Sequence, residues 1–158
     1  MPCDSTYKKK TFLRIYSSNK ASSSSYTNPV YYLNQKIENI SSFKIIDFFI
    51  RYTDSQSQSI KINSRELSNL TTDKIQGTYN GASQTILEIQ TQYSVVTDGI
   101  AEPDNKAGNR QLSKSPTYHC SNGELGVISF EFKNMDGTTD ASSFNEYDKW
   151  SMLIEFHH

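Results

Sequence analysis

Hydrophobic and polar residues alternate with a period of two in several stretches of this chain. The longest such stretch is 42–53, SFKIIDFFIRYT, where one set of alternate positions holds Ile46, Phe48, Ile50 and Tyr52. Successive side chains of a β-strand point to opposite faces. The pattern therefore predicts a long strand with one apolar, buried face.

Two shorter stretches follow the same rule. In 11–17, Leu13 and Ile15 share one face, and Phe12, Arg14 and Tyr16 share the other. In 58–63, Ile60 and Ile62 point inward and the residues between them outward. Because a polar turn separates 42–53 from 58–63, these two strands are predicted to form a hairpin.

The C-terminal part of the chain predicts two further strands. Ile128, Phe130 and Phe132 share one face of 126–133, and Asp136-Gly137 then favours a turn. The stretch 149–156 places four large apolar residues on one face: Trp150, Met152, Ile154 and Phe156. Repeated alternation of this kind is typical of two packed antiparallel sheets.

The stretch 83–96 has a different pattern. Ile86, Ile89 and Tyr93 recur at spacings of three and four, and Ser83 suits a helix N-cap. This predicts a short helix from Ser83 to Tyr93. A strand is the alternative, because β-branched residues are frequent here.

Length and composition favour one globular domain over the whole chain, 1–158. The chain is 35% hydrophobic and 12% aromatic, with a mean hydropathy of -0.65. Disordered chains lack such an aromatic content, and a domain of this size buries roughly 70% of its extended-chain surface. Polar residues dominate 17–28 and 98–118, which are predicted to be surface loops. Residues 1–10 are predicted to form a flexible N-terminal arm.

The charge balance points to no highly charged partner, since the formal net charge is -1. The one basic run is Lys8, Lys9 and Lys10, which suits a solvated tail or a weak contact with packaged DNA. No apolar run approaches the roughly 18 residues of a membrane span. We therefore expect a protein without a membrane span, made in a reducing compartment, with Cys3 and Cys120 reduced.

Candidate catalytic residues are few. His119, His157 and His158 are the histidines available as bases near neutral pH. His119 is adjacent to Cys120, but neighbouring residues of a strand point to opposite faces, which disfavours a nucleophile and base pair. We expect no enzymatic activity.

Candidate ligand sites are equally weak. Asp136 and Asp140 flank Gly137, but a calcium loop needs more oxygen ligands before its glycine. The glycines of 77–81, GTYNG, lack the Gly-Lys-Ser/Thr ending of a phosphate-binding loop. We expect neither a metal nor a cofactor.

Three tyrosines are candidate contact residues. Tyr26, Tyr31 and Tyr32 are grouped around Pro29, and tyrosine is enriched at protein interfaces. They either cap the end of the sandwich or contact a partner. Together with Lys8, Lys9 and Lys10 they form our set of candidate assembly contacts.

Taken together, these segments resemble the vertex (penton) capsid proteins of virophages and polinton-like double-stranded DNA viruses. The resemblance rests on the strand end Tyr16-Ser-Ser-Asn-Lys20 with its polar loop, and on five further segments along the chain. These are Phe43 to Thr53, Ser59 to Asn63, Ile75-Gln-Gly-Thr-Tyr79 with Ser83 to Tyr93, Ile128 to Gly137, and Tyr147 to Phe156.

The resemblance implies a single jelly roll of two four-stranded antiparallel sheets with one short helix. It also implies a homopentamer at the five-fold vertex of an icosahedral virion, beside the major capsid protein, after synthesis in the host cytoplasm. The alternative function is a receptor- or carbohydrate-binding sandwich of a viral spike or fibre. In that case Trp150 or the tyrosines would stack on the ligand, although Trp150 alternates with core residues.

Overall fold

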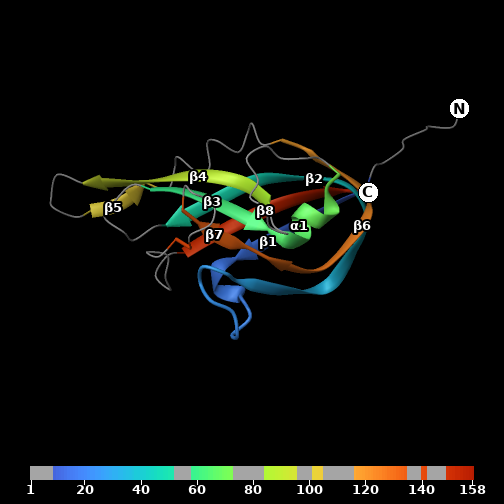
Figure 1. The fold of residues 1–158 in the computed structure, drawn as a ribbon, viewed down its shortest axis with the longest axis horizontal. Helices are drawn as coiled ribbons and strands as arrows, with labels where there is room; N and C mark the ends of the chain where they lie inside the picture. The colour runs from blue at the N-terminus through green and yellow to red at the C-terminus, as the bar shows by residue number, and fades with distance from the viewer. Residues whose placement is uncertain are drawn as a thin grey trace, which may run out of the picture.

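The computed structural model describes residues 9–51, 58–72, 84–95, 101–104, 116–134, 140–141 and 149–158. Strands dominate these residues, and the strands form two antiparallel sheets (Figure 1). The first sheet has the order β1 (Lys10–Tyr16), β8 (Lys149–His157), β2 (Val30–Arg51), β6 (Tyr118–Ser129). The predicted β-rich fold with two antiparallel sheets is thus confirmed.

The second sheet has three central strands, β4 (Gln84–Val95), β3 (Gln58–Ser64) and β7 (Glu131–Lys133). The short strand β5 (Ala101–Asp104) pairs with the far end of β4 and extends that sheet at one edge. Two helical turns complete the described elements: the 3-10 turn η1 (Ser17–Asn19) and the helix α1 (Arg65–Leu70).

The core is rich in aromatic side chains. Trp150 of β8 stacks on Phe48 of β2 with 5.9 Å between ring centroids. From the β7 side, Phe130 and Phe132 approach the same indole at 5.7 and 5.3 Å. Edge-to-face and offset ring pairs of this kind add stability beyond the area they bury. The predicted inward faces of 126–133 and 149–156 are confirmed, because every apolar residue named for them is buried. The prediction of a single strand over 126–133 is wrong, because this segment leaves β6 at Ser129 and continues as β7 in the other sheet.

A β-bulge corrects the predicted face of 42–53. Ile45 pairs with Ile154 and Asp47 pairs with Leu153, so Ile46 has no partner position on β8. The extra residue reverses the alternation: Ile45 is buried before it, and Phe48 and Ile50 are buried after it. The prediction that Ile46 lies on the buried face is therefore wrong, because Ile45 takes that place.

The predicted hairpin of 42–53 and 58–63 is also wrong. The first segment belongs to β2 and pairs with β8 and β6, whereas the second is β3 and pairs with β4 and β7. The chain crosses from one sheet to the other between them. The inward faces of both were assigned correctly at Phe48, Ile50, Ile60 and Ile62.

The predicted helix Ser83 to Tyr93 is wrong, and the alternative, a strand, is observed as β4. Its residues pair with β3, Ile89 opposite Ile60 and Leu87 opposite Ile62, so tertiary pairing overrides the helical spacing. The short helix is α1. Ser64 caps it by accepting from Leu67 N at 3.3 Å, and Glu66 in its first turn accepts from Ser129 N at 2.8 Å.

The segments predicted as a flexible N-terminal arm (1–10) and a long surface loop (98–118) both contain strand residues. β5 lies within 98–118, and β6 begins at Tyr118; residues 105–115 lie outside the described residues. Lys10 is the first residue of β1, and Lys9 O accepts from His158 N at 3.1 Å. Residues 1–8, the turn at Asp136-Gly137 and the glycines of 77–81 lie outside the described residues as well.

β2 and β6 bend together at one end of the molecule (Figure 1). Each strand has an asparagine in the left-handed region near the bend, Asn39 with φ 55° and Asn122 with φ 49°, a conformation that asparagine tolerates better than most residues. Next to Asn122, a Cβ on Gly123 would lie 2.3 Å from Leu70 Cδ2. A glycine there lets α1 pack directly on β6.

Candidate assembly surface

The outer face of β1, β8 and β2 carries exposed aromatic side chains. Phe12 is 57% exposed, Tyr16 48% and Phe49 41%. Tyr16 and Phe49 pair with the same residue of β8, Ser151, so they lie in one row across the sheet. The predicted division of 11–17 into two faces is confirmed, because Phe12, Arg14 and Tyr16 are exposed and Leu13 and Ile15 are not. We call this surface, with Phe12, Tyr16, Phe49 and the half-buried Leu153, the aromatic face.

Charged side chains on the aromatic face are held in cross-strand pairs. Arg14 Nη1 lies 3.6 Å from Asp47 Oδ2, across the strand that carries Leu153. Lys10 Nζ lies 3.4 Å from Glu155 Oε1, and His157 Nε2 lies 2.5 Å from the same oxygen. Lys10 and Arg14 of β1 are therefore each paired with a carboxylate of the same subunit.

Glu155 is the carboxylate of this face that lies within ion-pair distance of two basic side chains, Lys10 and His157. Partial burial raises its pKa, but hydrogen bonds and charge from Lys10 and His157 outweigh that effect and hold the pKa below its ordinary value. Glu155 therefore stays ionised at neutral pH and ties β8 to the first residue of β1.

β1 is the edge strand of its sheet, and β8 is its neighbour on the inner side. Lys9 O bonds to His158 N, so the odd-numbered residues of β1 direct their backbone groups toward β8. The N–H and C=O groups of Lys10, Phe12, Arg14 and Tyr16 then point outward. Among the described residues, no strand pairs with this outer edge.

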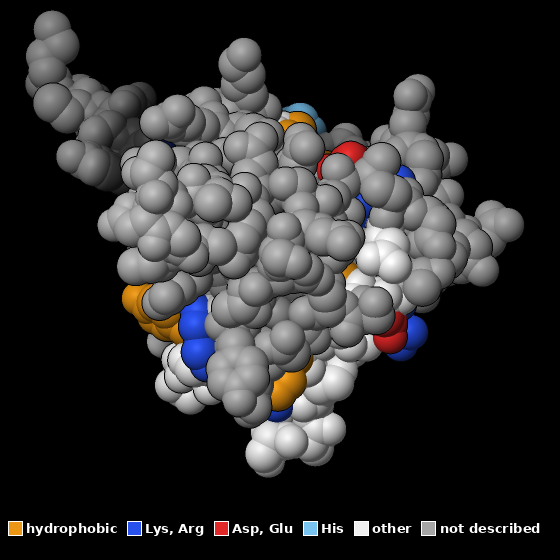
Figure 2. All heavy atoms as spheres, turned by 90° about the vertical axis from the view of Figure 1, so that its left-hand side faces the viewer, with side chains coloured by type: hydrophobic (Ala, Val, Ile, Leu, Met, Phe, Trp, Pro, Cys, Tyr) orange, Lys and Arg blue, Asp and Glu red, His pale blue; other side chains and the backbone are white. Residues whose placement is uncertain are grey.

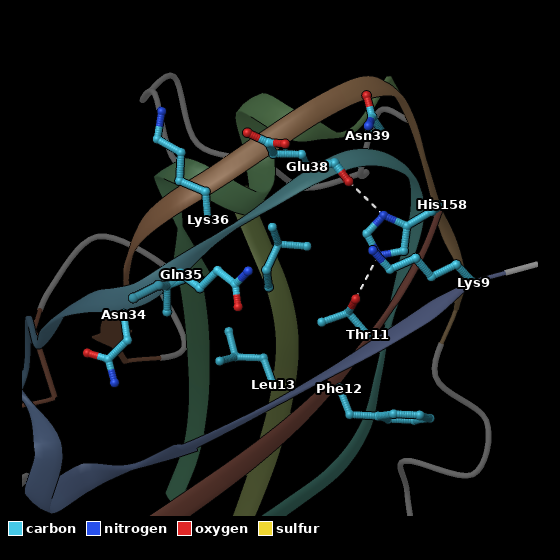
Figure 3. A pocket seen from close by; sticks show the side chains of 12 residues that line it. Lys9, Thr11, Phe12, Leu13, Asn34, Gln35, Lys36, Glu38, Asn39 and His158 are labelled. Atoms are coloured by element: carbon cyan, nitrogen blue, oxygen red, sulfur yellow. Dashed lines mark hydrogen bonds between the residues drawn. The ribbon is translucent and has the colours of Figure 1, made fainter.

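An open hollow of about 600 Å³ lies beside β1 (Figure 3). β1 forms one wall and residues 33–39 of β2 form the other. His158 bridges the two walls at one end: Thr11 Oγ1 lies 2.7 Å from its Nε2, and Glu38 O lies 2.6 Å from its Nδ1 (Figure 3). Amide side chains of Asn34, Gln35 and Asn39 line the wall that β2 forms.

The three candidate tyrosines have different environments. Tyr31 is a core residue, 5% exposed, and packs edge-on against Trp150 at 5.9 Å between ring centroids. In this buried position it does not contact a partner protein. Tyr32 is 70% exposed. Tyr26 is exposed as well and holds the Lys20 ammonium over its ring, 4.6 Å from the centroid. Tyr26 and Tyr32 therefore stay available for contact.

The basic run is not a uniform tail. Lys8 lies outside the described residues. Lys9 is exposed and lines the hollow, and Lys10 is a strand residue paired with Glu155.

The end of the molecule that contains the segment between β1 and β2 is largely polar. In Figure 2 the described atoms at the lower end of the molecule are mostly white, which marks backbone and uncharged polar side chains, with separate hydrophobic and basic groups beside them. Lys20 Nζ donates to Ser24 O at 2.7 Å and Ser24 Oγ donates to Ala21 O at 2.7 Å. Serine and lysine side chains thus stabilise this loop through its own backbone.

Two of the candidate histidines lie in one row of the first sheet, because His119 of β6 and His157 of β8 both pair with Ser42 of β2. Exposed His119 uses its carbonyl to accept from Thr71 Oγ1 and Thr72 N, at 2.9 and 2.8 Å, and Cys120 is half-buried beside it. The three histidines lie on β6 and at the end of β8. A hydrogen bond from Lys133, at 2.5 Å, lowers the pKa of Asp140; Asp136 lies outside the described residues.

The described residues lack two further features, a metal-binding cluster and a membrane-spanning helix. They contain no group of three or more His, Cys, Asp or Glu side chains arranged to hold a metal ion. Their helices include none with the length and apolar character needed to cross a membrane.

The exposed Phe49 was not singled out from the sequence. The available signal was its position: it is an apolar residue on the face of 42–53 that also carries Asp47 and Arg51.

Comparisons with protein-family models and with curated proteins find no match for this chain.

Proposed function

We propose that this protein is a structural subunit of a virus capsid, with a single jelly-roll fold, that forms a homopentamer at the five-fold vertex. Its partners in this proposal are four further copies of itself and the neighbouring major capsid protein. Its work is assembly, without enzymatic activity or a cofactor. The place of action is the virion vertex, after synthesis in the host cytoplasm.

The strand order carries the proposal. The first and last strands, β1 and β8, are neighbours within one sheet. Along the described strands the chain changes sheet between β2 and β3, between β5 and β6, at Phe130 between β6 and β7, and between β7 and β8. A jelly roll wraps two Greek keys in this manner, and the fold recurs in viral capsid domains.

A second observation supports a complete second sheet. Phe132 N donates to Thr27 O at 2.8 Å, and Phe130 N donates to Pro29 O at 3.1 Å. The segment before β2 therefore adds to the outer edge of β7. It occupies the position that a strand between β1 and β2 would take in an eight-stranded jelly roll.

The surface chemistry suits contact with other protein subunits. Phe12, Tyr16 and Phe49 expose aromatic rings while the nearby charges are paired within the subunit, and aromatic side chains are enriched at interfaces. Lys8 and Lys9 remain candidates for weak contact with packaged DNA.

A carbohydrate- or receptor-binding function is the second candidate. The hollow beside β1 favours it, because Asn34, Gln35 and Asn39 offer amide donors and acceptors there, with Phe12 among the lining residues. Polar side chains of this kind next to an aromatic ring suit a sugar. Trp150, proposed earlier as a stacking platform, is buried in the core and is not available for that role.

Electron cryomicroscopy of particles from the source virus tests the first proposal. The expected result is density for this chain at the five-fold vertices, with antibody against the chain labelling the same positions. A particle whose vertices hold a different protein would refute the vertex assignment. A glycan-array signal that disappears in N34A/Q35A, with the fold intact, would support the second candidate instead.

A further inference from the structure

We infer that the outer edge of β1 pairs with β1 of a second copy, antiparallel and about a two-fold axis. The starting observation is the row of outward backbone groups on Lys10, Phe12, Arg14 and Tyr16, to which no described strand is bound. A row of this kind is a template for pairing with another strand. At seven residues, β1 is longer than the very short edge strands by which many proteins avoid association.

The usual protection of an edge strand is weak here. Lysine and arginine normally discourage association by projecting over an edge. Arg14 instead reaches over β8 to Asp47, and Lys10 is held by Glu155 of β8. Each of the two cations therefore already has a carboxylate partner within its own subunit, while Phe12 and Tyr16 stay exposed next to them.

The sequence of β1 is complementary to itself in one register. With Leu13 on the two-fold axis, Phe12 lies opposite the partner's Arg14, and Tyr16 lies opposite the partner's Lys10. All four outward-bonding residues then form hydrogen-bonded cross-strand pairs. Each pair places a cationic side chain, or its aliphatic stem, against an aromatic ring.

The neighbouring registers are unfavourable. A shift by one pair in one direction places Lys10 opposite the partner's Arg14. A shift in the other direction places Arg14 opposite the partner's Arg14. Like charges directly opposite each other destabilise a sheet, so one register is selected. A second copy is therefore the occupant that the chemistry of this edge fits.

The edge pair has a different symmetry from the proposed pentamer. A two-fold contact uses the same surface on both copies, whereas a closed ring of five uses two different surfaces. The dimer therefore describes the subunit before it enters a shell. At a vertex the β1 edge would be released or taken by another shell protein.

The first experiment uses the full chain and the substitution F12K, which places an ammonium opposite the partner's Arg14. Sedimentation velocity over a concentration series should show a dimer for the wild type. For F12K the dissociation constant should rise on the order of tenfold or more, because two like-charge pairs form in each dimer. F49K is the matched control, since Phe49 is a similarly exposed aromatic of the same face but lies away from the edge; its dimer should be unchanged.

The second experiment restores the pair with opposite charge. In F12K/R14E, a carboxylate faces each new ammonium, and dimerisation should return toward the wild-type level. Circular dichroism and the thermal midpoint confirm that each variant folds. A wild type that sediments as single chains at its highest soluble concentration would overturn the inference, as would equal weakening by F12K and F49K. A pentamer insensitive to F12K would overturn the edge pair while supporting the vertex assignment.

Discussion

The two sheets differ in how their edges are finished. The outer edge of β7 is covered by the chain itself: Thr27 and Pro29 accept hydrogen bonds from Phe132 and Phe130, and Ala141 N donates to Phe132 O at 2.9 Å. The outer edge of β1 has no described strand hydrogen-bonded to it and exposes Phe12 and Tyr16. The same chain thus closes one edge with its own backbone and leaves the other suited to a partner.

Stability and association are therefore expected to separate between these two regions. Side chains around the β7 edge pack against Trp150, and their loss should cost folding free energy. The aromatic side chains of the β1 edge, Phe12 and Tyr16, are 57% and 48% exposed, and their loss should cost association with little effect on folding. The following substitutions test this division from the largest expected effect to the smallest.

Trp150→Ala should have the largest effect. The indole contacts Tyr31, Phe48, Phe130 and Phe132, so truncation leaves a cavity where both sheets meet. We expect a loss of about 3–5 kcal/mol in the free energy of unfolding, measured by urea denaturation. Phe12→Ala on the open edge is the control and should lose no more than about 0.5 kcal/mol. Similar losses for the two variants would contradict the division.

The core around Trp150 was the part of the fold most accessible from sequence. Period-two patterns in 126–133 and 149–156 assign the buried side chains correctly, because alternate residues point inward along both segments, even where 126–133 passes from β6 to β7. The pattern fails where one residue changes the alternation, as at Ile46, or where helical spacing coincides with a strand, as in β4. The sheet to which β2 or β3 belongs depends on pairing with strands that are distant in the sequence. Local alternation predicts which face of a strand is buried, but it does not predict that pairing.

The candidate surface was less accessible for a related reason. Tyr26, Tyr31 and Tyr32 are alike in sequence terms, yet Tyr31 is buried against Trp150 and Tyr32 is exposed. Adjacent strand residues face opposite ways, so one of Tyr31 and Tyr32 had to point inward, but the inward one depends on where β7 and β8 lie. The open edge of β1 follows from strand order alone, and no local pattern reports it.

Gly123→Ala should have the next largest effect, at the place where α1 covers β6. The added Cβ would lie 2.3 Å from Leu70 Cδ2, so the helix must shift or Leu70 must change rotamer. We expect a loss of about 1 kcal/mol, at the low end for an added core methyl group, because the clash is with the tip of the Leu70 side chain, with recovery when Leu70→Ala makes room. Gly126→Ala is the matched control, because its Cβ would meet Lys36 Cγ at 3.4 Å, an ordinary contact. Equal losses for G123A and G126A would show that close helix packing is not the cause.

Tyr31→Phe should have a small effect of opposite sign. The Tyr31 hydroxyl is buried and finds no hydrogen-bond partner in the described part of the chain. Removing an unsatisfied buried hydroxyl should be neutral or stabilise by about 1 kcal/mol. Burial also raises the pKa of Tyr31, so the wild type should lose stability as pH rises above about 10, where the unfolded tyrosine ionises.

Thermal unfolding of Tyr31→Phe and wild type at neutral and alkaline pH measures both effects. The advantage of the variant should grow with alkalinity. Tyr32→Phe is the control, since its side chain is 70% exposed, and should leave stability unchanged. A clear loss of stability in Y31F at neutral pH would mean that the hydroxyl has a partner.

Glu155→Gln should have the smallest effect, and it reports on the open edge. Glu155 joins β8 to Lys10 of β1 and accepts from His157. Because its pKa is lowered in the folded state, the stabilisation is present above the unfolded value of roughly 4.3 and is lost as pH falls through the folded value. At neutral pH the variant should lose about 0.2–1 kcal/mol, the range of surface ion pairs. Below about pH 4 the difference from wild type should shrink.

Equilibrium unfolding from neutral to acid pH measures this difference directly. Glu124→Gln removes the more exposed pair with Lys36, whose charged atoms lie 3.3 Å apart, and should leave stability unchanged at neutral pH. A difference for E155Q that stays constant into acid would mean that Glu155 contributes by packing. In that case the β1 edge would be held to β8 by its backbone ladder, and the charge on Lys10 would be free to guard the edge against a second copy.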